Sequence, residues 1–192
     1  MKNYNNSEET QKKILDIAVK LLSEDNYEDT SVSKICSLAG VSTASFYHQI
    51  GSKEKLIKIT YEVHMEETNK LLAEMPDKSA IEKIDFVIDR HIEHTLLYGY
   101  KYYKYFLKLE LDNKLYPKEN NSRPFHRYLK TLAEQGVANN EFNKKYNSNY
   151  IHRSILTASR GCVYEWCVAE GNFDLKKELK LHLSILFKEF VK

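Results

Sequence analysis

The chain has 192 residues with a formal net charge of +2 and only three cysteines. It contains no apolar run of about 18 residues and no signal-peptide core near its start, so we expect neither a membrane span nor secretion. Three cysteines cannot form a disulfide framework, and we expect reduced thiols in a cytoplasmic protein that holds one compact unit or a small head on a larger body.

The first predicted element is an amphipathic helix. Ser7 can cap it, and its apolar residues recur at helical spacing along one stripe: Ile14, Ile17, Ala18, Leu21 and Leu22. We expect this stripe to pack on Val32, Ile35 and Phe46 of the next segment. The sequence therefore predicts a small three-helix core at the start of the chain.

Residues 31–56 hold three short helix signals with a glycine turn between the first two. Ser31 and Ser42 each suit the N-cap position of a helix, because their hydroxyl oxygens can accept from free backbone N–H groups. Gly40 suits the left-handed residue that ends the helix between them. Ser52 can cap the third helix. This order is typical of a helix-turn-helix, which lays its second helix in the DNA major groove.

The polar side chains of this segment are candidates for contacts with DNA. Phe46 and Ile50 are four residues apart and should face the core, which leaves hydroxyl, imidazole and amide groups to reach base edges or phosphates. Lys53 lies beside the free N–H groups of a helix start and suits a phosphate, although it could also be a solvated surface residue. The predicted DNA-binding residues are Ser31, Lys34, Ser42, Thr43, Ser45, Tyr47, His48 and Lys53.

Positive charge is concentrated in the same segment. Residues 1–30 carry four lysines and seven acidic residues, whereas residues 31–60 carry four lysines and one acidic residue, Glu54. No arginine precedes Arg90, so the predicted DNA-binding segment, called the head below, cannot make bidentate arginine–guanine contacts. We expect the protein to recognise its site through small polar side chains and DNA shape. We do not expect non-specific binding to nucleic acid through a broad basic surface.

The rest of the chain reads as helices. A helix from Lys53 to about Glu74 leads to a break at Met75–Asp77, and further helices are expected at 79–97, 100–115, 123–137, 148–170 and 174–191, with breaks at glycine, proline and asparagine positions. No segment alternates as a strand does. We predict an all-α fold of about nine helices, with a DNA-binding domain at 1–55, a connecting helix at 53–75 and a helical ligand-sensing and dimerisation domain at 76–192.

The last two predicted helices carry apolar and small residues on one face. Such a pair can meet a symmetry mate as a four-helix bundle, and a dimer would bind two half-sites about one helical turn apart. The predicted interface residues are Ile155, Ala158, Cys162, Trp166, Leu179, Leu183 and Leu186. The alternative is that both stripes are buried within one subunit.

Metal and catalytic sites receive little support from the sequence. His91 and His94 are three residues apart, but Cys162 and Cys167 do not have the spacing of a zinc knuckle. No glycine-rich phosphate loop, nucleophile elbow or paired acid with an evident base is present. We therefore predict no metal, no cofactor and no enzymatic activity.

The segment from Glu9 to Leu56 closely resembles the N-terminal domain of the tetracycline-repressor (TetR) family. The residues that carry the resemblance are ILDIAVKLL at 14–22, Tyr27, Thr30, Ser31, Ile35, Ala39-Gly40-Val41-Ser42, Phe46-Tyr47-His48 and Ser52-Lys53-Glu54-Lys55-Leu56. Two positions depart from the family pattern: Cys36 stands where alanine is usual, and Gln49-Ile50 replaces a pair that ends in Phe. Both keep a small or apolar residue, so the motif is retained.

The resemblance implies that the last two helices form a homodimer interface and that a small-molecule pocket lies among the middle helices. Within this aromatic-rich part, the candidate pocket residues are His91, Tyr103, Phe106, Tyr128 and Tyr164. Rings with hydroxyl tips suit a flat or amphipathic ligand, although many of them could simply be core or surface residues. The chemistry of this effector cannot be read from the sequence.

The sequence thus predicts a homodimeric transcriptional regulator, expected to be a repressor that binds a palindromic operator in double-stranded DNA. By the resemblance, ligand binding would shift the helix at 53–74 as a lever and change the spacing of the two heads. An alternative is a TetR-like co-activator or adaptor whose head engages a protein partner, which the lysine-only head leaves open. An enzyme is a distant third interpretation.

Overall fold

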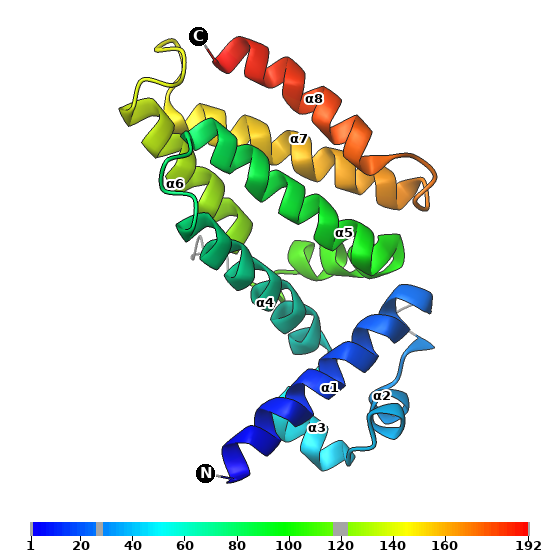
Figure 1. Ribbon diagram of the computed structural model, residues 1–192. Helices are drawn as coiled ribbons and strands as arrows, with labels where there is room; N and C mark the ends of the chain where they lie inside the picture. Colours follow the sequence, from blue (N-terminus) through cyan, green and yellow to red (C-terminus); the bar gives the residue numbers. More distant parts are fainter. Residues whose placement is uncertain (1, 26–28, 117–122, 192) are drawn as a thin grey trace. The chain divides into compact units, whose positions relative to one another are not determined.

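The computed structural model describes residues 2–25, 29–116 and 123–191, with the backbone alone for residues 2–7. These residues form an all-helical chain without a β-strand (Figure 1). The helices are α1 (Lys2–Glu24), α2 (Val32–Ala39), α3 (Thr43–Gln49), α4 (Lys53–Ala73), α5 (Ala80–Leu111), α6 (Pro124–Ala138), α7 (Ser148–Val168) and α8 (Leu175–Phe190). None of these helices is long and apolar enough to cross a membrane. Tyr27 and most of the loop expected at 117–124 lie outside the described residues.

The predicted helices are confirmed with two differences. Helix α1 begins at Lys2 rather than after Ser7, so Ser7 lies inside the helix instead of capping it. The helices expected at 79–97 and 100–115 form one element, α5, that is interrupted at Gly99. Gly99 has φ 76° and ψ 169°, a conformation open essentially to glycine alone, so the break was predicted at the right residue. Counting α5 as two helices gives the expected nine among the described residues.

The described residues divide into two units by their packing. The first unit contains residues 1–63 and 98–115, and the second contains residues 64–97 and 116–192. Helices α4 and α5 therefore each contribute to both units. The break at Met75–Asp77, which the sequence marks as a domain boundary, falls inside the second unit; this division describes packing, and the functional boundaries given above stay a prediction.

The core of the first unit is formed by apolar side chains of α1, α2 and α3. Ile14 and Ala18 on α1, Ile35 on α2 and Phe46 on α3 have no exposed surface, and the three helices pack on one another in pairs. This is the small core that the helical spacing predicts. Burying these side chains provides the main stabilisation of helices this short, which are marginal on their own.

A buried tyrosine ties the start of α4 to the end of α5 within the first unit. The Tyr102 hydroxyl donates to the backbone carbonyl of Ile57 (3.1 Å) and shares a 2.7 Å hydrogen bond with the hydroxyl of Thr60. All three groups are almost fully buried. Because a buried hydroxyl left unpaired is costly, these bonds fix the register between the two helix segments.

The second unit is built around α6, α7 and α8, which pack in sequence (Figure 1). Ile155 on α7, with Leu175 and Leu179 on α8, is fully buried there. At its surface, Lys180 Nζ lies 2.5 Å from Asp85 Oδ1 and 3.1 Å from Asp89 Oδ2. These ion pairs tie α8 to α5, although partly exposed pairs contribute little stability.

Candidate functional site

The turn between α2 and α3 has the capping chemistry that the sequence predicts. Ser31 Oγ accepts from the backbone N–H of Lys34 (3.1 Å), and Ser42 Oγ accepts from that of Ser45 (3.0 Å). Gly40 adopts the left-handed conformation at φ 65°, and its N–H bonds back to carbonyls of the last turn of α2. Each helix end is thus satisfied locally.

Helix α3 is amphipathic over its two turns. Phe46 has no exposed surface, whereas Tyr47 is 54% exposed, and the two rings meet edge to face with centroids 5.5 Å apart. Thr43 and His48 are also exposed, and Ser45 is half-buried. A hydrogen bond from Gln11 Nε2 on α1 to the carbonyl of Gln49 (3.3 Å) joins the end of α3 to α1. Helix α3 therefore presents hydroxyl and imidazole groups on a face that the core fixes in orientation.

Thr43 has a contact that the sequence did not indicate. Its hydroxyl forms a hydrogen bond with the buried thiol of Cys36; burial raises the pKa of this thiol and the hydrogen bond partly offsets that rise. The contact joins the first turn of α3 to α2 across the turn. Thr43 therefore both stabilises the motif and faces outward, and helical periodicity within either helix could not have revealed this.

The two predicted lysines lie in different settings. Lys34 Nζ is 2.6 Å from Asp25 Oδ2, with both side chains more than a third exposed, so its charge is balanced before any ligand arrives. Lys53 is the first residue of α4 and is half-buried. Ser52 caps that helix, as predicted, by accepting from the N–H of Lys55 (3.1 Å). The positive potential of the head is thus reduced at Lys34.

The candidate pocket residues lie in both units. In the first, Tyr103 and Phe106 are buried with ring centroids 5.5 Å apart. In the second, His91 is buried and the Tyr128 hydroxyl donates to the carbonyl of Met65 (3.2 Å), while Tyr164 is 55% exposed on α7. Tyr128 and Tyr164 are therefore not packed as a pair of buried rings, and the pocket prediction stays a prediction.

Five of the predicted interface residues are already buried within the single chain. Ile155, Cys162, Trp166, Leu179 and Leu183 are at most 5% exposed, because α7 and α8 pack on each other. Ala158 and Leu186 are only half-buried. The large apolar side chains that these two helices leave exposed are Tyr150, Tyr164, Val168, Leu181 and Ile185. Much of the predicted stripe is therefore covered within the subunit itself, and the assignment of a dimer interface to these two helices stays a prediction.

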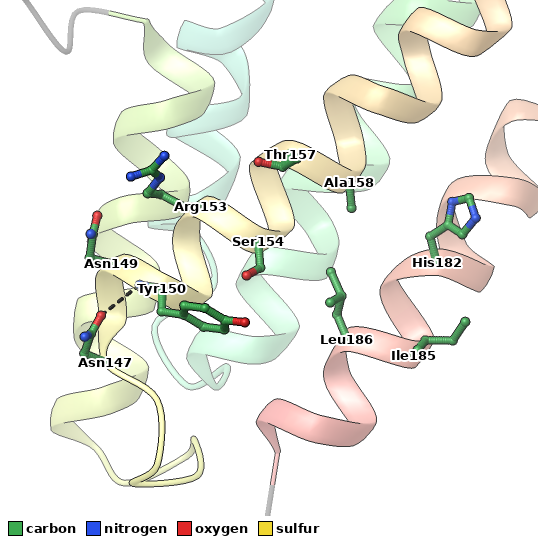
Figure 2. A pocket seen from close by; sticks show the side chains of 10 residues that line it. All are labelled: Asn147, Asn149, Tyr150, Arg153, Ser154, Thr157, Ala158, His182, Ile185 and Leu186. Carbon is green, nitrogen blue, oxygen red and sulfur yellow. Dashed lines mark hydrogen bonds between the residues drawn. The ribbon is translucent and has the colours of Figure 1, made fainter.

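An open groove of about 730 Å³ runs between α7 and α8 (Figure 2). Ala158 from α7 and Leu186 from α8 point toward the space between the helices in this view. Its lining combines polar and apolar side chains: Asn147, Asn149, Tyr150, Arg153, Ser154, Thr157, Ala158, His182, Ile185 and Leu186. A shallow surface of this kind is suited to contact with another protein surface rather than to enclosing a small molecule.

Acidic, histidine and cysteine side chains do not assemble a metal site in the described part of the chain, where no group of three or more has suitable geometry. Burial and the nearby charge of Glu178 raise the pKa of Cys162 to about 11, which leaves the thiol protonated and unreactive.

Comparisons with known proteins agree with the geometry of the head. The family described as bacterial regulatory proteins, tetR family, matches residues 14–58. The HTH-type transcriptional regulator YvdT of Bacillus subtilis is 25% identical over 146 residues, 75% of either chain. The fatty acid metabolism regulator protein of the same organism is 24% identical over 168 residues, 84% of this chain and 86% of that one.

The fold beyond the head is also shared. The solved structure of CprB, a TetR family protein from S. coelicolor A3(2), superposes with a TM-score of 0.67 and 16% identity, covering 96% of this chain and 90% of that one. This likeness concerns the fold alone, while the match over 14–58 concerns the helix-turn-helix described above. Residues 14–58 therefore form a helix-turn-helix domain of the TetR family of bacterial regulatory proteins.

Proposed function

We propose that this regulator is a dimeric, ligand-responsive repressor that acts in the cytoplasm on a palindromic operator. The observation that carries the proposal is α3, whose Phe46 is fully buried while Tyr47 is more than half exposed. A short helix anchored in this way can enter the major groove without losing its orientation. In this proposal Thr43, Ser45 and His48 face the bases, and Tyr47 and Lys53 contact phosphates.

The dimer proposal rests on the outer faces of α7 and α8. Leu181 and Ile185 are 55% and 59% exposed on α8, and Tyr164 and Val168 are 55% and 61% exposed on α7. Exposed apolar side chains on two helices that pack together are typical of a protein contact surface. A two-fold interface there would use each of them twice and would cover the groove between the helices.

Substitutions in the head should separate phosphate contacts from base contacts. Tyr47→Phe and Lys53→Ala should each weaken binding to all duplexes by roughly three- to tenfold, and Lys53→Ala should lower the salt dependence of binding by about one counterion per head. Thr43→Ala should instead change the base preferred at one position of each half-site. Fluorescence anisotropy with a panel of single-base operator variants measures both effects. Equal losses from all three substitutions at a single base pair would contradict these roles.

Releasing Lys34 from its ion pair should strengthen DNA binding. Asp25→Asn removes the partner 2.6 Å from Lys34 Nζ, which adds one net positive charge to each head and should steepen the salt dependence by up to about 0.9 per head. The loss of stability should stay within about 1 kcal/mol, because the pair is exposed. The experiment is a titration of labelled duplex at several salt concentrations.

Glu66→Gln is the matched control for this change. It removes the same charge from an exposed ion pair with Lys70 (3.5 Å) on α4, outside the helix-turn-helix. An increase in affinity that is the same for both variants would show that net charge, rather than Lys34, is responsible.

A charge on the outer face of α8 should separate the subunits. Ile185 is 59% exposed in the single chain, so Ile185→Glu should change the stability of the subunit by less than about 0.5 kcal/mol. At a two-fold interface it would place two carboxylates in an apolar contact, and the dimer dissociation constant should rise by at least about tenfold. Analytical ultracentrifugation across a dilution series measures it.

Leu111→Glu provides the comparison, since Leu111 is 80% exposed at the end of α5 in the first unit. This variant should dimerise as the wild type does. If Ile185→Glu dimerises equally well, the interface lies elsewhere.

A further inference from the structure

Helix α6 begins without a side-chain cap. Its N-cap residue, Arg123, makes no capping hydrogen bond, and Pro124 occupies the first helical position. The backbone N–H groups of Phe125 and His126 in this first turn have no acceptor within the helix. The start of a helix carries a partial positive charge and attracts anions, although many helix ends are simply solvated, so this feature alone assigns no site.

The second observation is a buried histidine on the neighbouring helix. His152 on α7 is 7% exposed, and neither of its ring nitrogens has a hydrogen-bond partner among the described residues. The Nε2 atom of His126 likewise has none there. The two rings lie edge to face with centroids 5.8 Å apart. Buried polar atoms are nearly always paired in native proteins, so these three unpaired nitrogen atoms on two adjacent rings call for a missing partner.

The charges around this pair favour an anion. Burial, followed by the charges of Arg160, Arg123 and His152, lowers the pKa of His126 to about 3. Burial also lowers the pKa of His152, with Lys130, Arg153 and Arg160 acting in the same direction and Glu134 against them. Both rings are therefore neutral near pH 7, and each offers one N–H donor. Positive side chains outnumber negative ones, so a metal cation would be repelled.

We propose that the first turn of α6 and His152 of α7 bind the carboxylate group of a small molecule. Two backbone N–H groups and two ring N–H groups provide four donors, which equals the lone-pair positions of one carboxylate. The Phe125 ring of the same turn is buried and stacks on His91 with centroids 4.3 Å apart, which holds this turn in place. As the effector site of the repressor, this site rests on the proposed function; as a binding site, it does not.

Benzoate is the probe for the test, with the full chain labelled with ¹⁵N at histidine. Titration should shift the ring-nitrogen signals of His126 and His152, assigned through His126→Gln and His152→Gln, while the signal of His48 on α3 stays in place. Benzamide has the same shape without the charge and should bind at least about tenfold more weakly. Millimolar benzoate that leaves every histidine ring signal unshifted overturns the proposal, and this result needs no variant to fold.

Two further arms distinguish the alternatives. If phenyl phosphate shifts both ring signals and binds with higher affinity than benzoate, the assignment to a carboxylate is overturned. His126→Gln and His152→Gln should each lower the affinity for benzoate by about tenfold or more, checked in variants with wild-type circular dichroism. Fluorescence anisotropy with operator duplex then tests regulation. If benzoate binds at the rings without releasing DNA, the binding site is supported but its role as an effector site is contradicted. If the chain binds no duplex at all, only the proposed function is contradicted.

Discussion

Replacing Phe46 with alanine should lower the free energy of unfolding of the first unit by about 3–5 kcal/mol. The ring has no exposed surface and fills the space behind the two-turn helix α3. Deleting it removes apolar contacts and leaves a cavity that α1 and α2 cannot close without moving. Since native domains are stable by only about 5–15 kcal/mol, α3 should lose its fixed orientation and DNA binding should fall below detection. Urea unfolding followed by circular dichroism, with anisotropy on duplex DNA, measures both.

The adjacent residue provides the control. Tyr47 is 54% exposed, so Tyr47→Ala should change stability by less than about 1 kcal/mol while still reducing DNA affinity. Comparing Phe46→Ala with Tyr47→Ala separates the effect of the folding of the head from the effect of its contacts with DNA. A Phe46→Ala protein that unfolds and binds DNA as the wild type does would show that α3 is not the helix that binds.

The second large effect is expected at Gly136 on α6. A Cβ atom there would lie 2.4 Å and 2.8 Å from two ring carbons of Phe142 and 3.1 Å from the Cβ of Ala80. Alanine normally stabilises a helix relative to glycine by about 0.5–1 kcal/mol. Here the Phe142 ring is itself buried and must move, at an overpacking cost of about 1–3 kcal/mol. Gly136→Ala should therefore destabilise the second unit by about 1–2 kcal/mol.

The same glycine-to-alanine substitution at a position with free space should increase stability instead of lowering it. At Gly161 on α7 no atom lies within 4 Å of the added Cβ, so Gly161→Ala should stabilise the subunit by about 0.5–1 kcal/mol. Both variants are best compared by thermal unfolding in the Ile185→Glu background, where association does not contribute. Equal stabilisation at the two positions would mean that Phe142 does not pack against Gly136 as described.

The features that could be predicted from the sequence are those set by neighbouring residues. Ser31 and Ser42 cap helices and Gly40 ends one because a hydroxyl or a missing Cβ acts within about four residues. The break at Gly99 was predicted for the same reason. The start of α1 was wrong at Ser7, since a serine can also lie inside a helix.

Features that depend on distant partners could not be predicted. The ion pair of Lys34 with Asp25 and the hydrogen bond of Thr43 with Cys36 join different elements, and periodicity reports only which side chains share a face. The spacing on α8 likewise predicts an apolar face, but it does not tell whether Leu183 on this face is covered by its own subunit or by a partner. Amphipathic spacing gives a buried face without naming the neighbour that buries it.

The central claim is that α3 reads DNA as one of a symmetric pair. Its most direct test is selection of duplexes from a random library by the purified chain at low salt, followed by footprinting of the enriched sequence. The account predicts a palindrome with half-sites spaced by about one helical turn, roughly 10 base pairs, and no enrichment by Phe46→Ala. Failure of the wild-type chain to enrich any palindromic sequence would contradict it and favour a head that engages a protein partner.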